Sequence, residues 1–184
     1  MMQKNRLSKK MQAGLNAQMT KEASASQIYL SYAAWASGNG YGGIANFLFR
    51  HANEERNHMM KILEYILERG ANVKMEAILS PAEDPTSIQN CFEQIFEHEV
   101  DNTQGIYKLV KMSFDEEDWA TWNFLQWFVK EQIEEEMLVM DLLDKMKLAG
   151  GEKISSDALY SMDRDIEKKS GESKLAEDVT AENP

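Results

Sequence analysis

The sequence predicts an all-α protein: a four-helix bundle with one long crossover connection and a short fifth helix at the carboxyl end. Four segments of helical periodicity, each roughly 26 to 31 residues long, make up most of the chain. Only three prolines occur, and two of them, Pro81 and Pro85, lie in the one long internal stretch without that periodicity. Helices of about 40 Å, at 1.5 Å per residue, bury their apolar faces most simply against one another.

The first two helices are expected to fold back on each other at a glycine-rich turn. The first runs from residue 7 to residue 37, before the sequence GNGYGG at 38–43. The second runs from residue 44 to residue 69 and stops at Gly70, because glycine readily takes the left-handed conformation that ends a helix.

Ser87 is the predicted N-cap of the third helix, which ends near Phe114. The acidic run DEED at 115–118 marks a corner, and the fourth helix continues to Gly150. The turns near 40 and 116 are short, whereas about sixteen residues at roughly 3.3 Å each, between the second and third helices, can span the whole bundle. The predicted topology is therefore up–down, crossover, up–down.

A short fifth helix is predicted from Ser155 or Ser156 to about Lys168. Its apolar side carries Leu159, Met162 and Ile166. Because four helices already close the bundle, we expect this side to contact neighbouring copies of the chain. Residues 1–168 form one predicted domain, and the polar segment 169–184 is expected to be a disordered tail.

The composition excludes several classes of function. A formal net charge of −11 disfavours nucleic-acid binding, which needs an excess of Lys and Arg, and suits a protein that attracts cations. The single cysteine, Cys91, cannot form an internal disulfide. No run of about eighteen apolar residues predicts a membrane-spanning helix, and the first fifteen residues lack the apolar block of a secretory signal. We therefore expect a cytoplasmic protein without a membrane partner.

Glu55 and His58, in the sequence NEERNH at 53–58, lie on the apolar face of the second helix. They are three positions apart and share that face with Phe47, Leu48 and Ile62. A solvated ion pair would be the simpler interpretation of an isolated Glu-x-x-His. A repeated interval argues against it, because 77 positions separate each of three pairs: Glu22 and Glu99, Glu55 and Gln132, His58 and Glu135.

Antiparallel helices that turn near 40 and 116 bring these residues to one level of the bundle. Carboxylates that meet in an apolar interior repel each other unless cations neutralise them. Carboxylate oxygens with one imidazole and one amide, and without thiolate, suit iron or manganese at a bridged pair of metal ions. Glu55 is the better candidate for the bridge. Gln132 and Glu135 stand where a symmetric site would have Glu and His, so one metal position is weaker and more exchangeable.

The sequences HANEERNH at 51–58, FEHE at 96–99 and FLQWFVKEQIEEEM at 124–137 resemble bacterial non-haem ferritins, from about residue 7 to 168. The resemblance implies a ferritin-like bundle and a ferroxidase, which oxidises Fe(II) with dioxygen at a centre holding two irons. The ferric mineral is then stored in a hollow shell of twenty-four subunits. By position, Glu22, Glu55 and His58 correspond to the ligands of the first iron. Glu55, Glu99 and, more loosely, Gln132 correspond to those of the second.

The resemblance also implies features around the centre. Bacterial members often have a third iron position, which here would use four carboxylates: Glu54, Glu131, Glu134 and Glu135. Tyr29 corresponds to a tyrosine beside the centre that hydrogen-bonds a ligand or supplies an electron, and Trp127 has the matching place on the fourth helix. Haem is not expected, because Arg56 stands where haem-binding bacterioferritins have methionine.

Other residues with metal-binding atoms are expected to have structural roles. His51 is expected near the centre or at the surface rather than as a ligand, and His98 outside the bundle. The methionines at helical core spacing are expected to pack: Met59, Met60, Met137 and Met140.

Two alternative functions remain open at the level of sequence. A di-metal peroxidase of the rubrerythrin type normally carries a cysteine-rich module, and this chain has one cysteine. A helical interaction protein would use its acidic residues for solubility alone.

Overall fold

Four long helices form the body of the molecule in a computed structural model that describes residues 4–81 and 83–168. They are α1 (Lys9–Gly38), α2 (Gly42–Glu68), α3 (Ile88–Asp115) and α4 (Trp119–Leu148). A 3₁₀ turn, η1 (Gly151–Lys153), leads to α5 (Ser156–Glu167). No strand occurs in the described part of the chain, and the predicted all-α fold is confirmed. The predicted tail, 169–184, lies outside the described residues.

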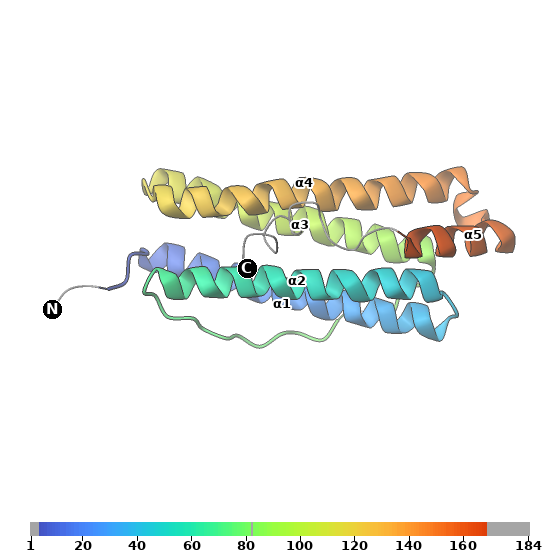
Figure 1. Cartoon of the computed structure of the whole chain (residues 1–184), viewed down its shortest axis with the longest axis horizontal. Helices are drawn as coiled ribbons and strands as arrows, with labels where there is room; N and C mark the ends of the chain where they lie inside the picture. The colour runs from blue at the N-terminus through green and yellow to red at the C-terminus, as the bar shows by residue number, and fades with distance from the viewer. Residues whose placement is uncertain (1–3, 82, 169–184) are drawn as a thin grey trace, which may run out of the picture.

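The helices form two antiparallel hairpins, α1 with α2 and α3 with α4, which lie side by side along their full length (Figure 1). The connection from α2 to α3 runs back along the outside of the bundle, so that α3 starts at the opposite end (Figure 1). The predicted order of a hairpin, a long crossover and a second hairpin is therefore correct. Among the described residues, no helix combines the length and the apolar character needed to cross a bilayer.

Polar side chains cap the start of most helices, as the sequence suggested for Ser87. Its hydroxyl oxygen accepts a hydrogen bond from the backbone N–H of Asn90 at 3.0 Å. Asp118 and Ser155 cap α4 and α5 in the same way. These contacts satisfy N–H groups that have no partner within the helix and so fix where each helix begins.

The start of α2 is capped from a distance by α5. Tyr41, the residue before α2, provides no side-chain cap. Instead, the Asp163 carboxylate accepts hydrogen bonds from the backbone N–H groups of Gly43 at 3.0 Å and Ile44 at 2.9 Å. The negative charge at this helix end is also favourable for the helix dipole.

The expectation that α5 needs neighbouring copies to bury its apolar side is therefore wrong. Met162 and Ile166 are buried against the same chain, in a cluster with residues of the other helices. The sequence indicated the apolar side of α5 but not that the surface beside the start of α2 is available to bury it. Contact between α5 and other copies is not required to bury these residues.

Replacing Gly43 with alanine is expected to undock α5. A Cβ atom at Gly43 would lie 2.0 Å from the carbonyl oxygen of Asp163, so the backbone of α5 must move. Overpacking of this kind costs about 1–3 kcal/mol, and here it also removes the cap of α2. Urea unfolding and the rate of proteolysis within α5 measure the effect. Gly42→Ala is the matched control, because a Cβ there meets no atom within 4 Å; equal behaviour of the two variants would contradict the prediction.

Two hydrophobic clusters fill the bundle, one toward each end. One contains Phe47, Phe92 and Leu142, and the other contains Leu15, Ile62 and Phe128. In each long helix, a short polar stretch lies between its contributions to the two clusters. The buried residues of those stretches include Glu22, Glu55, His58, Glu99, Asn102, Glu131, Gln132 and Glu135. The apolar core is thus interrupted by one polar layer near its middle.

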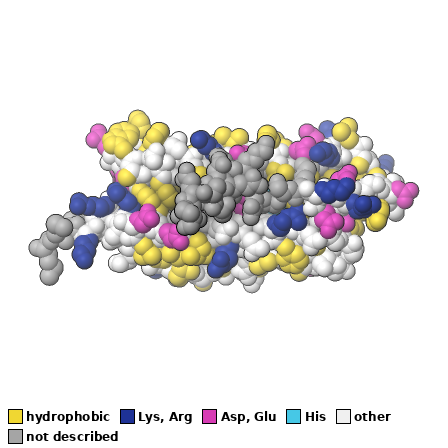
Figure 2. Space-filling model, viewed as in Figure 1, with side chains coloured by type: hydrophobic (Ala, Val, Ile, Leu, Met, Phe, Trp, Pro, Cys, Tyr) yellow, Lys and Arg dark blue, Asp and Glu magenta, His cyan; other side chains and the backbone are white. Residues whose placement is uncertain are grey.

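The surface is charged but mixed in sign on the face shown in Figure 2, where Lys and Arg side chains are interspersed with Asp and Glu. Two of the methionines expected in the core lie at the surface instead, with 60% of Met137 and 44% of Met140 exposed. Glu131, Gln132 and Glu135 occupy the side of α4 that faces the other helices. Fewer of the apolar residues of α4 are therefore buried than their spacing suggests.

Candidate metal centre

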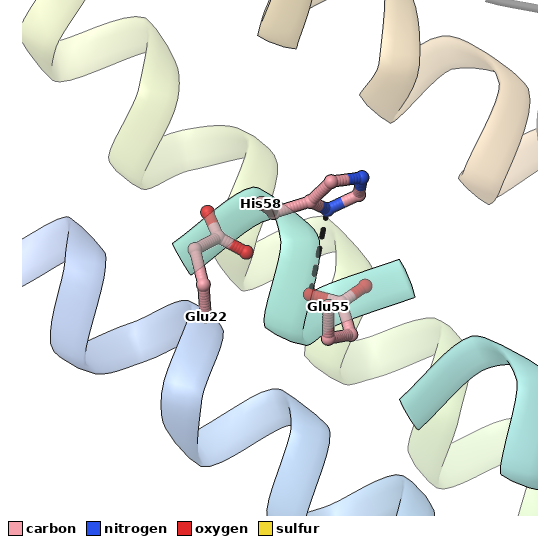
Figure 3. A group of neighbouring side chains, drawn as sticks. All are labelled: Glu22, Glu55 and His58. Atoms are coloured by element: carbon pink, nitrogen blue, oxygen red, sulfur yellow. Dashed lines mark ion pairs between the residues drawn. The ribbon is translucent and has the colours of Figure 1, made fainter. Parts of the chain in front are cut away.

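Helices α1 and α2 bring Glu22, Glu55 and His58 together in the middle of the bundle. In Figure 3, Glu22 extends from α1 toward Glu55 and His58 of α2. One donor atom from each residue lies within 4.8 Å of the others, and all three side chains are buried. His58 Nδ1 approaches Glu55 Oε2 to 3.7 Å, as the dashed line in Figure 3 marks. The three residues predicted for the first iron position therefore converge.

Glu99 and Gln132 come from the other hairpin and are in contact with each other. Gln132 Nε2 donates a hydrogen bond to Glu99 Oε2 at 3.2 Å. The hydroxyl of Tyr29 donates to the other oxygen of Glu99 at 2.8 Å, so this tyrosine lies beside the centre. Glu99 is fully buried, and its charge adds to the effect of burial in raising the pKa of Glu55. The second set of predicted residues thus adjoins the first.

Two amide side chains hold Glu22, and the sequence alone did not indicate either of them. Gln18 Nε2 donates to Glu22 Oε1 at 2.8 Å, and Asn102 Nδ2 donates to Glu22 Oε2 at 3.1 Å. Asn102 Nδ2 also lies 3.4 Å from Gln132 Oε1 and so connects both halves of the centre. Gly105 leaves room for this arrangement, because a Cβ there would lie 2.4 Å from Gln18 Oε1.

Helical spacing is the one feature of the sequence that could have placed Gln18 and Asn102 near the centre. Gln18 precedes Glu22 by one helical turn, and Asn102 follows Glu99 by three positions, so both share the inward faces of their helices. Amides at such positions are compatible with many roles, and only the offset between α1 and α3 determines which carboxylate they meet.

Glu54, Glu131 and Glu135 are buried beside the centre and belong to two further groups of donor atoms. One group is Glu54, His58 and Glu131, and the other is His51, Glu54 and Glu135. Glu134, the fourth carboxylate implied for a third iron, is half-buried and belongs to none of the groups found among the described residues. Of the four carboxylates implied for a third iron, the structure therefore brings Glu54, Glu131 and Glu135 into groups of donor atoms, but not Glu134.

His51 is the residue whose surroundings the sequence indicated least well. It is 2% exposed, stacked on Tyr29 with ring centroids 5.6 Å apart, and tilted against Phe47 at 4.2 Å. Its Nδ1 atom lies 3.3 Å from Glu54 Oε2. Burial lowers the pKa of His51 to about 3, so the imidazole is neutral at pH 7 and the contact is not an ion pair.

The carboxyl groups of the centre are costly to ionise without a cation. Burial, together with the charges of Glu99 and Glu22, raises the pKa of Glu55 well above its ordinary value. Burial is also the main cause that raises the pKa of Glu99 and of Glu135. Both oxygens of Glu55 lack a hydrogen-bond donor within the described part of the chain. Such groups favour a protonated form or a bound cation.

Aromatic residues close one side of the layer. Trp127 and Phe128 both meet the ring of His58 edge-on, at centroid distances of 5.3 and 6.0 Å. Burial raises the pKa of Tyr29 well above 10, which keeps its hydroxyl protonated and able to donate to Glu99. Cys91 is buried in an apolar cluster that also contains Phe92 and Ile95, and belongs to none of the donor groups found in the described residues.

The donor set is chemically suited to divalent cations of intermediate hardness. Carboxylate oxygens from three or four helices, with imidazole nitrogen, are the ligands of bridged iron and manganese pairs. The paired charges of two such ions would remove the repulsion among Glu22, Glu55 and Glu99. The geometry therefore supports a metal centre at the group formed by Glu22, Glu55 and His58, with Glu99 buried beside it.

Comparison with known protein families identifies the architecture that carries this centre. The family model for the ferritin-like domain matches residues 12–149, which include α2, α3, α4 and all but the first three residues of α1. The chain belongs to the ferritin family. Its ferritin fold also agrees with a crystal structure of an open-pore ferritin from the hyperthermophilic archaeon Archaeoglobus fulgidus. That comparison has a TM-score of 0.85 and 37% identity, and covers 89% of this chain and 98% of the other.

Relatives of this ferritin include two proteins that are 40% identical to it. One is described as a probable bacterial non-haem ferritin-like protein of Haemophilus influenzae, and the match covers 83% of this chain and 90% of that protein. The other is a bacterial non-haem ferritin of Campylobacter jejuni, with 78% and 86% covered. The resemblance seen in the sequence motifs is thus confirmed, and membership of the family implies iron binding.

Proposed function

We propose that this ferritin oxidises Fe(II) with dioxygen at the buried centre and stores the ferric product as a mineral inside a shell built from copies of itself. The observation that carries the proposal is the convergence of Glu22, Glu55 and His58 in one buried group of donor atoms, with Glu99 beside it. Family membership supports iron storage, and the donor types support a site for two ferrous ions as substrate.

Each residue of the centre has a role in this proposal. Glu22, Glu55 and His58 bind the first ferrous ion, and Glu55 with Glu99 binds the second. Gln132 contributes to the second position, which is the weaker one because an amide replaces a carboxylate. Tyr29 holds Glu99 through its hydroxyl, and Gln18 and Asn102 hold Glu22. Oxidised iron leaves the weaker position first and passes to the mineral.

The remaining parts of the proposal follow from the ferritin family. Twenty-four copies form the shell, and dioxygen is the oxidant. Glu54, Glu131 and Glu135 are the proposed ligands of a third iron next to the pair. Glu134 is implied as a further ligand only by the resemblance. No haem takes part, in keeping with relatives that are non-haem ferritins.

The mass and the iron content of the protein after aerobic Fe(II) addition test the proposal. Size-exclusion chromatography with mass detection is run before and after loading, and iron per subunit is measured in the protein peak. Storage predicts a large assembly that retains far more iron than the centre itself can bind. A di-metal peroxidase would stop at about two ions per subunit. A bundle that serves only in protein interactions would retain none, and either of these results would overturn the proposal.

A further inference from the structure

The side-chain amide of Gln132 has contacts that distinguish its two ends. Its Nε2 atom donates to Glu99 Oε2 at 3.2 Å, to the backbone carbonyl of Glu99 at 3.3 Å and to Thr103 Oγ1 at 3.3 Å. Its Oε1 atom lies 3.4 Å from Asn102 Nδ2. Only the oxygen of an amide can bind a cation, because the NH₂ group is a donor. The direction in which this amide points therefore decides whether Gln132 can serve as a ligand.

Thr103 of α3 and Glu136 of α4 fix that direction from one side. Thr103 Oγ1 donates a hydrogen bond to Glu136 Oε1 at 2.5 Å. A hydroxyl group has a single proton, so a threonine that donates to Glu136 can only accept from Gln132. The reverse orientation of the amide would place the Gln132 oxygen against the Thr103 oxygen, with no proton between them. The contact with Thr103 thus selects the nitrogen end of the Gln132 amide.

Asn102 selects the same orientation from the other side. Its Nδ2 atom donates to Glu22 Oε2 at 3.1 Å, and its Oδ1 atom accepts from Gln18 Nε2. An ionised carboxylate can only accept, so the nitrogen of Asn102 must face Glu22. The atom of Gln132 that meets this nitrogen is then the oxygen. Gln132 Oε1 therefore lies on the side of Glu22, and Gln132 Nε2 lies on the side of Thr103.

The contact between Gln132 and Glu99 cannot by itself maintain this orientation during function. Glu99 is a proposed ligand of the second cation, and an oxygen that binds a cation is a poorer acceptor for Gln132. Glu136, in contrast, belongs to none of the donor groups found in the described residues. Thr103 is buried and Glu136 is half-buried, so their hydrogen bond is partly shielded from water. This contact remains when a cation binds.

We propose that Thr103 and Glu136 are positioning residues, which keep the oxygen of Gln132 available to the second cation. They act through the direction of one hydrogen bond and do not touch the cation themselves. The inference rests on the proposed function, in which Gln132 contributes to the second position. It adds that the binding strength of this position depends on a hydroxyl and a carboxylate outside the ligand set.

Crystals of the whole protein soaked in a series of Co(II) concentrations test the inference, because Co(II) binds without being oxidised by air. In the unchanged protein, anomalous peaks are expected at both positions, with Gln132 Oε1 at coordination distance from the second. Thr103→Val keeps the shape of the side chain and removes the hydroxyl, so the amide can turn. Half-occupancy of the second position is then expected to need at least about 10-fold more Co(II), with the first position little changed.

Two further variants separate the hydroxyl from packing. Thr103→Ser restores the hydroxyl and is expected to restore the binding of the second Co(II). Glu136→Ala leaves the Thr103 proton free to point at Gln132 and is expected to weaken the second position as Thr103→Val does. Because residue 136 is half-buried, this variant keeps the inference testable if Thr103→Val does not fold. Thr20→Val is the matched control, since the Thr20 hydroxyl donates only to the backbone of Asn16 in its own helix, at 3.0 Å.

Equal Co(II) dependence of the second position in Thr103→Val, Glu136→Ala and the unchanged protein would overturn the inference. An equal loss in Thr103→Ser and Thr103→Val would also overturn it, because the effect would then come from packing. The same holds if Gln132 lies away from the second Co(II) in the unchanged protein. Absence of Co(II) between Glu22, Glu55 and His58 would instead count against the proposed function.

Discussion

Replacing Glu55 with alanine is expected to slow the fast phase of Fe(II) oxidation by at least about 100-fold, since even groups that only orient metal ligands change activity by 10–100-fold. Glu55 is central to the effect because it is a ligand of both metal positions in the proposed function. One of its oxygens approaches His58, and burial together with the charge of Glu99 raises its pKa. Loss of its carboxylate therefore weakens both positions together.

Stopped-flow mixing of Fe(II) with the aerobic protein, followed by the absorbance of the ferric product, measures this rate. His58→Ala is expected to behave similarly, since His58 is the imidazole ligand of the proposed first position. Glu64→Ala provides the control, because Glu64 is an exposed carboxylate on the same helix and should leave the rate unchanged. A circular dichroism spectrum shows whether each variant keeps its helices. A normal rate in folded Glu55→Ala would remove the basis for the assigned centre.

A redox-inert divalent cation is expected to raise the unfolding temperature strongly near pH 7.5 and only weakly near pH 5. Without cations, the pKa values of Glu55, Glu99 and Glu135 lie above the ordinary 4.5 in the folded protein. The folded state then binds protons more tightly than the unfolded chain. These groups favour folding most at pH values below 4.5, and that contribution is lost as the pH rises through their raised pKa values.

Cation binding has the opposite dependence on pH, because each metal ligand must first release its proton. At a free concentration of 100 times the dissociation constant, one site adds about 2.7 kcal/mol to the free energy of unfolding. Two sites in the pair would add about twice that at pH 7.5. Calorimetric scans of the metal-free protein with and without Co(II), at both pH values, measure the difference. An equal increase at pH 5 and pH 7.5 would show that the raised pKa groups are not the ligands.

The convergence of Glu22, Glu55 and His58 could be predicted because helical geometry fixes which faces and levels of the bundle they occupy. A spacing of three positions places Glu55 and His58 on one face, and the positions of the two turns set the level of Glu22 and Glu99. Sequence cannot give the contacts that depend on the offset between neighbouring helices. Asn102 meets Glu22 of α1 as well as Gln132 of α4, and nothing in its own helix determines this.

The docking of α5 likewise depends on how separate helices are placed, which the sequence does not give. The sequence identifies an apolar side with Met162 and Ile166 but contains no local sign of its partner. The partner is set by a three-dimensional match, in which Gly43 leaves space for the α5 backbone and Asp163 reaches free N–H groups. His51 is a third case, since its shared face with Glu55 was visible but its stacking on Tyr29 was not.

The difference between Glu22 and Glu55 has a consequence for which metals the centre accepts. Amide donors anchor both oxygens of Glu22, whereas the carboxylate of Glu55 has no such anchor in the described residues. The Glu22 carboxylate is therefore held in one orientation, whereas the Glu55 carboxylate can turn to suit ions of different radius. Ionic size alone gives such a pocket little power to discriminate, so zinc and manganese should compete with iron for entry, and only the ability to give up an electron to oxygen would then distinguish iron.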